Sequence, residues 1–146
     1  MPDLITKIKH YEELLKEILE ISEKYLGVMS VKLLVERVLW DVSQEYKEIT
    51  FLRYDENGVS TDALVKALED TPDFPIDEMF KKFFTRYAEI LAKLVGKEPA
   101  EKYWNVFQKK FELLFNTKIM HITMEVIKLF ESLFEMYGGV FEKQKL

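Results

Sequence analysis

Two histidines are each followed by a glutamate at helical spacing. Glu13 lies three residues after His10, and Glu125 lies four residues after His121. At these spacings the two side chains of a pair share one face of a helix and could supply two metal ligands. A di-iron bundle needs a Glu-x-x-His motif on two helices and further inward glutamates, and that order is absent. We expect both histidines to be solvated or interface residues, with metal ligation and acid–base catalysis as the alternatives.

Other residue types limit the chemistry further. The chain has no cysteine, which excludes disulfides, thiolate catalysis and cysteine-ligated metal sites. Its five glycines all fall where helices or turns should end, so none remains for a loop that cradles phosphate. No Gly-x-Ser-x-Gly motif of a serine hydrolase occurs. We therefore expect no catalytic residue and no cofactor that can be named from the sequence.

Two groups of acidic residues could be taken for functional sites, but their sequence context does not support a function. Asp55-x-Asn57-Gly58 resembles part of a calcium loop, but the alignment puts Arg53 first and Leu64 twelfth, where acids are required. We expect a plain turn there. The adjacent acids Glu12-Glu13 and Asp55-Glu56 have the spacing of ordinary exposed carboxylates. No metal site is predicted.

Charge and hydropathy narrow the range of partners. The net charge is −5 and the positive residues form only short pairs next to acids, so a nucleic-acid partner is not expected. No apolar run reaches the roughly 20 residues that a membrane span needs. The chain start carries acids and lacks an apolar core, unlike a signal peptide. The high share of lysine and glutamate favours a cytoplasmic protein and leans towards a thermophile-like composition.

The apolar periodicity predicts an all-α fold: one domain over 1–146, a bundle of five to six helices with a short extended or hairpin excursion at about 49–59. Ser30 is the expected N-cap of the second helix, with Met29 and Leu34 forming a hydrophobic staple. Leu33 and Trp40 form a second apolar strip on that helix. The predicted elements are helices at 3–26, 31–46, 61–69 (capped by Ser60) and 76–95, a linker and candidate hinge at 70–75, and one or two helices over 99–137.

The stretch from Pro99 to Tyr137 has an unusually narrow polar face. Its apolar positions keep a helical phase across Asn116, which leaves one long helix or two helices split there. A helix with so little polar surface should be covered on two or more sides, by the bundle or by another subunit. We expect the following residues to form a self-association interface: Ile119, Ile122, Val126, Leu129, Phe130, Leu133 and Tyr137.

Aromatic residues concentrate on helix 76–95 and on the helix after Pro99. The simplest interpretation is an aromatic core at helical spacing, and an aromatic-rich protein interface is another. A third is an apolar pocket for a flat or lipidic ligand. Its lining would be Phe80, Phe83, Tyr87, Trp104, Phe107 and Phe111.

The leading hypothesis from the sequence is a non-enzymatic cytoplasmic interaction module with a regulatory or scaffolding role. It would be a homodimer through the C-terminal helix, and an unidentified protein partner is also open. The alternative is a binding protein for an apolar or aromatic small molecule, held between helix 76–95 and the helix after Pro99. An unrecognised enzymatic activity ranks third.

Overall fold

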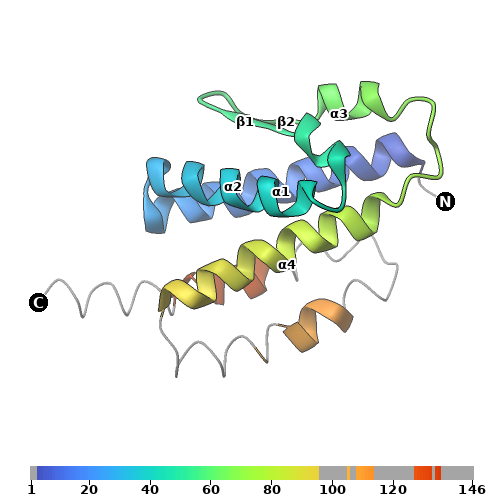
Figure 1. Ribbon diagram of the computed structural model, residues 1–146. Helices are drawn as coiled ribbons and strands as arrows, with labels where there is room; N and C mark the ends of the chain where they lie inside the picture. Colours follow the sequence, from blue (N-terminus) through green and yellow to red (C-terminus); the bar gives the residue numbers. More distant parts are fainter. Residues whose placement is uncertain (1–2, 96–104, 106–107, 114–126, 133, 136–146) are drawn as a thin grey trace, which may run out of the picture.

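The computed structural model describes residues 3–95, 105, 108–113, 127–132, 134 and 135. It is mostly helical with one small antiparallel hairpin, which confirms the predicted all-α fold. Figure 1 shows α1 and α2 side by side, with α4 packed against them and the hairpin and α3 on the other side of this pair. The elements in order are α1 (Leu4–Leu26), α2 (Val28–Ser43), η1 (Lys47–Phe51), β1 (Arg53–Asp55), β2 (Gly58–Ser60), α3 (Asp62–Ala67) and α4 (Ile76–Val95).

A single residue, Gly27, separates α1 from α2. Its φ of 84° lies in the left-handed region, which glycine adopts without the steric penalty that a Cβ brings. Its N–H donates to the carbonyl of Glu23 at 2.8 Å, and its own carbonyl accepts from Val31 at 3.2 Å. The prediction of Ser30 as the N-cap of the second helix was therefore wrong. Because Gly27 closes one helix and opens the next, Ser30 lies inside α2.

The segment predicted as extended or as a hairpin, at about 49–59, begins within a 3₁₀ turn and continues as a β-hairpin. Residues 47–51 form a 3₁₀ turn that buries Ile49, and the Thr50 hydroxyl donates to the Lys47 carbonyl at 2.8 Å. The hairpin itself begins at β1, with Arg53 paired to Ser60 and Asp55 to Gly58. The Asp55 carboxylate accepts from the N–H of Asn57 at 2.8 Å, and Gly58 has a φ of 95°. The hairpin prediction is confirmed, and the extended start at Ile49 is corrected.

The short helix α3 starts one residue later than its predicted cap implies. Its N-cap is Thr61 rather than Ser60, and the Thr61 side chain makes no capping bond because it is bound to α1 instead. Backbone hydrogen bonds from Thr71 to Leu68 (3.0 Å) and from Phe74 to Thr71 (3.1 Å) shape the linker that follows. The hinge at 70–75 and the single-domain organisation stay predictions.

Helix α4 has the predicted bounds and provides the centre of the core. Its buried face packs on α1 and α2. The Tyr11 ring of α1 stacks on Phe80 with ring centroids 4.5 Å apart. Fully buried members of the core from the three helices are Ile8, Leu14, Leu15, Ile18, Val31, Val38, Val42, Met79, Phe80, Phe83, Phe84 and Tyr87.

Two helical segments beyond α4 meet the same ring. Phe111 of segment 108–113 and Phe130 of segment 127–132 have ring centroids 6.5 and 6.3 Å from that of Phe84. Nineteen residues of one straight helix span about 28 Å, which is too far for both rings to contact Phe84. The two segments are therefore not successive turns of one straight helix. Residues 114–126, where the sequence places Asn116, lie outside the described residues.

Candidate functional site

The first histidine pair does not form a metal site among the described residues. His10 is half-buried on α1, its ring lies edge-on to Tyr11 at 6.2 Å, and burial lowers its pKa from the ordinary histidine value. Glu13 is exposed and lies 3.7 Å from the ammonium of Lys16. No cluster of three His, Asp or Glu side chains suited to a metal occurs in the described part of the chain. The second pair, His121 and Glu125, lies outside the described residues.

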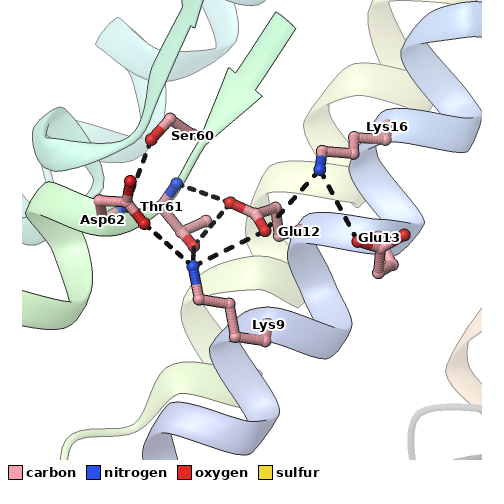
Figure 2. A network of polar contacts seen from close by, with 7 residues as sticks. All are labelled: Lys9, Glu12, Glu13, Lys16, Ser60, Thr61 and Asp62. Atoms are coloured by element: carbon pink, nitrogen blue, oxygen red, sulfur yellow. Dashed lines mark hydrogen bonds and ion pairs between the residues drawn. The ribbon is translucent and has the colours of Figure 1, made fainter.

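A buried carboxylate joins α1 to the start of α3 (Figure 2). Glu12 is 9 % exposed, so the prediction that it is an ordinary exposed acid was wrong. One of its oxygens accepts two hydrogen bonds from Thr61, one from the backbone N–H and one from the hydroxyl, both at 2.9 Å. The other oxygen lies 3.7 Å from the ammonium of Lys9 and 3.9 Å from that of Lys16.

This network places a hydroxyl, a carboxylate and an ammonium together, as some hydrolases do. Lys9 donates to the Thr61 hydroxyl at 3.3 Å and to Asp62 at 3.1 Å. Thr61, however, is completely buried, so no substrate could reach its oxygen. Because Glu12 accepts the hydrogen bonds of both Thr61 donors, we interpret the cluster as a polar contact that links α1 to the start of α3 and not as a reaction centre.

A second polar contact lies inside the helical core. Tyr87 of α4 donates from its hydroxyl to Ser22 of α1 at 2.6 Å, and Ser22 donates in turn to the carbonyl of Ile18 at 2.7 Å. Burial raises the pKa of Tyr87 well above its ordinary value. Both side chains are fully buried, so this pair also holds helices together.

Four of the six residues expected to line an apolar pocket belong to a packed aromatic cluster. Phe80, Phe83, Tyr87 and Phe111 are each no more than 2 % exposed. Neighbouring rings touch: Phe83 lies 6.2 Å from Tyr87, and Phe84 lies between Phe83 and Phe111. These four rings belong to the buried core of the described part of the chain. Trp104 and Phe107 lie outside the described residues, and the pocket between helix 76–95 and the helix after Pro99 stays a prediction.

The C-terminal helix is described in part. Phe130 is fully buried against Phe84 and Tyr87, and Leu129 is half-buried against the core. Ile127 and Phe134 are also buried, so 127, 130 and 134 form an inward face within one chain. The other expected interface residues lie outside the described part: Ile119, Ile122, Val126, Leu133 and Tyr137. Self-association through this helix stays a prediction.

Two grooves open on the described surface, and both are lined mainly by polar residues. A groove of about 380 Å³ lies between α2 and α4, where Asp41 pairs with Arg86 at 2.6 Å. A wider groove of about 940 Å³ lies between the hairpin and the junction of α1 and α2, and its apolar lining includes Val28 and Met29. The same two residues begin the apolar surface of α2.

The outer face of α2 carries large apolar side chains in water. Met29, Leu33 and Trp40 are 68 %, 63 % and 60 % exposed, and we refer to these three as the α2 strip. They lie on one side of the helix, opposite the buried valines at 31, 35, 38 and 42. Met29 is not the staple partner of Leu34 that the sequence suggested, because α2 starts before Ser30 and turns Met29 outward.

Two opposite charges flank the α2 strip. Glu36 and Arg37 are both exposed and lie between Leu33 and Trp40 in the sequence. The Arg37 guanidinium lies over the Trp40 ring, 5.9 Å from its centroid, and 3.5 Å from Asp41. The sequence pattern shows Leu33 and Trp40 as an apolar strip, but a pattern alone does not tell an exposed strip from a covered one.

No helix within the described residues is both long enough and apolar enough to cross a membrane. Comparison of the chain with protein-family models, with curated proteins and with solved structures found no match to any of them.

Proposed function

We propose that this protein is a non-enzymatic helical interaction module that binds a protein partner through the outer face of α2. The single observation that carries the proposal is the α2 strip: three large apolar side chains on one helix face, each more than half exposed. Isolated exposed apolar residues are normal, but several large ones gathered on one helix face with polar flanks are typical of a protein contact surface.

The residue types support a binding surface. Tryptophan, methionine and arginine are enriched at protein interfaces, and tryptophan and arginine dominate their binding energy. Here Trp40 and Arg37 already lie one over the other, so the arginine is held near the ring before any partner arrives. A side chain that is pre-positioned loses less conformational entropy on binding.

The polar clusters support a role other than catalysis. Within the described residues, the buried carboxylate of Glu12 and the buried hydroxyls of Thr61 and Ser22 make hydrogen bonds within the fold. We propose a regulatory or scaffolding role, and the charge-rich composition leads us to propose the cytoplasm as its compartment. Self-association through the C-terminal helix is a further part of this proposal that rests on the sequence alone.

Photo-crosslinking from the α2 strip tests the proposed function. A photoreactive amino acid is placed at position 33, and in a control chain at position 66, an exposed position on α3. Irradiation of the cells that produce the protein should give defined protein adducts from position 33 and none of the same mass from position 66. Equal adduct patterns from both positions, or no adduct from position 33, would contradict a binding surface on α2.

A further inference from the structure

Four residues on the outer face of α2 form a diamond on the helix surface. Leu33, Glu36, Arg37 and Trp40 occupy positions i, i+3, i+4 and i+7, so each apolar residue is a helix-surface neighbour of both charged residues. The two apolar side chains lie at the ends of this diamond, along the helix axis. The acid lies on one flank and the base on the other.

We propose that the partner of this face is a second copy of the chain, packed with the two α2 helices parallel about a two-fold axis that runs along them. This inference rests on the proposed function and deepens it by naming the partner. Its basis is that the diamond is complementary to itself in that one arrangement.

In the parallel arrangement, identical apolar residues face each other along the axis, and opposite charges face each other on the two flanks. A two-fold axis parallel to the helices keeps each residue at its own height, so Trp40 meets Trp40 of the partner subunit and Leu33 meets Leu33 of the partner subunit. The same axis exchanges the two flanks. Glu36 therefore faces Arg37 of the partner subunit, and this charge pair forms twice.

The antiparallel arrangement lacks this complementarity. A two-fold axis perpendicular to the helices keeps each flank on its own side, so Glu36 would face a second Glu36 and Arg37 a second Arg37. Like charges that face each other across an interface oppose association. The charge pattern thus selects the parallel pair, and it gives the strip a partner that supplies a matching tryptophan, leucine and methionine.

The described elements of the subunit leave the outer face of α2 uncovered for this contact. The buried valines of α2, at 31, 35, 38 and 42, point towards α1 and α4, and the diamond points the opposite way. A second copy can therefore approach without a change in the positions of α1, α2 or α4. One helix pair is a small interface, at the low end of the range for specific complexes, so we expect dimers in the micromolar concentration range.

Charge reversal with complementation tests the pairing. The full chain is measured by sedimentation equilibrium over a dilution series, as wild type, Glu36→Arg and Arg37→Glu. Each single change makes two repulsive pairs and should weaken dimerisation on the order of tenfold or more. An equimolar mixture of the two variants restores both pairs as a heterodimer. The double variant E36R/R37E restores them within a homodimer. Both should recover wild-type affinity.

Matched controls separate pairing from folding and from total charge. Glu69→Arg and Lys66→Glu make the same charge changes at exposed positions near the end of α3, and should leave the dissociation constant unchanged. Thermal unfolding by circular dichroism should show that E36R and R37E stay folded. Trp40→Ala removes two facing rings from the dimer and should weaken it about thirtyfold or more.

Three results would overturn the inference. They are a wild type that is monomeric across the whole series, single variants that associate as well as wild type, or a mixture that binds far more tightly than wild type, which is the mark of antiparallel pairing. Adducts from position 33 that contain another protein and no second copy would also overturn it, while leaving the proposed function standing. Failure of the proposed function itself would instead appear as the absence of any adduct specific to position 33.

Discussion

The α1–α3 junction buries a charged side chain, whereas the outer face of α2 exposes apolar ones. At the junction, a carboxylate that could be solvated is enclosed, and each of its oxygens has partners among Thr61, Lys9 and Lys16. On α2, apolar side chains that could be enclosed are in water. Within the described residues, no buried side-chain nitrogen or oxygen lacks a hydrogen-bond partner. The contrast indicates that the polar groups inside stabilise the fold, whereas we propose that the apolar groups outside bind a partner.

Removing the buried carboxylate should have the largest effect on stability. Glu12→Ala leaves the N–H and the hydroxyl of Thr61 without their acceptor, and should lower the free energy of unfolding by on the order of 2–4 kcal/mol. Glu12→Gln keeps an acceptor oxygen and should lose less. Urea unfolding followed by circular dichroism measures both. The neighbouring exposed acid provides the control, since Glu13→Ala should cost less than about 0.5 kcal/mol. Equal losses for Glu12 and Glu13 would remove the distinction between the two regions.

The hydrogen bond between Tyr87 and Ser22 should come next. Tyr87→Phe keeps the ring in the aromatic cluster and removes only the hydroxyl, so it should cost about 1 kcal/mol of unfolding free energy. Tyr46→Phe is the matched control, because the Tyr46 hydroxyl reaches Glu78 at 3.3 Å near the surface. The control should cost less than about 0.5 kcal/mol. A Tyr87→Phe protein as stable as wild type would mean that this buried bond contributes nothing net.

The ion pair between Asp41 of α2 and Arg86 of α4 should make a pH-dependent contribution of intermediate size to the free energy of unfolding. The hydrogen bond from Arg86 holds the pKa of Asp41 below its ordinary value of 3.8, against the opposing effect of burial. A carboxylate with a lowered folded-state pKa contributes stability above its unfolded pKa, and loses it as the pH falls through the folded value. The stability difference between wild type and Asp41→Asn should therefore be largest near neutral pH and shrink in acid. Asp73→Asn, in the exposed segment before α4, is the control.

The smallest stability change should come from the α2 strip, despite its large side chains. Leu33→Ala, measured on dilute protein, should change the unfolding free energy by less than about 0.5 kcal/mol, because Leu33 is mostly in water. Val38→Ala on the inner face of the same helix should cost on the order of 2 kcal/mol. If the two changes cost the same in dilute protein, the strip is covered within one chain, and both proposals for α2 fall.

Local rules predicted the helices well where periodicity and breakers agreed. The bounds of α4 follow from the proline before it and from its apolar spacing, and α1 follows from the Asp3 cap and Gly27. Ser30 has the residue type of an N-cap, but Gly27 closes α1 and opens α2 and so leaves no cap position for a serine. The β-propensity of Ile49 predicts a strand, whereas tertiary burial decides its conformation.

The candidate site was less predictable, because exposure is a property of the assembled chain. Glu12 has the spacing of a solvated acid, and only the position of Thr61, far away in the sequence, makes it buried. Leu33 and Trp40 had the right spacing for an apolar strip, but the sequence could not say whether another helix lay over it. In both cases the deciding contact is between segments that no local pattern connects.

The single residue Gly27 between α1 and α2 fixes the direction in which the proposed binding face of α2 points. An inserted residue there would rotate α2 by about 100° relative to α1. The valines would then leave the core and the tryptophan would turn towards it, even though every helix kept its own sequence. The number of residues between α1 and α2 thus sets the direction in which the proposed binding face points. A change of that direction would require new residues on both the buried and the exposed face of α2.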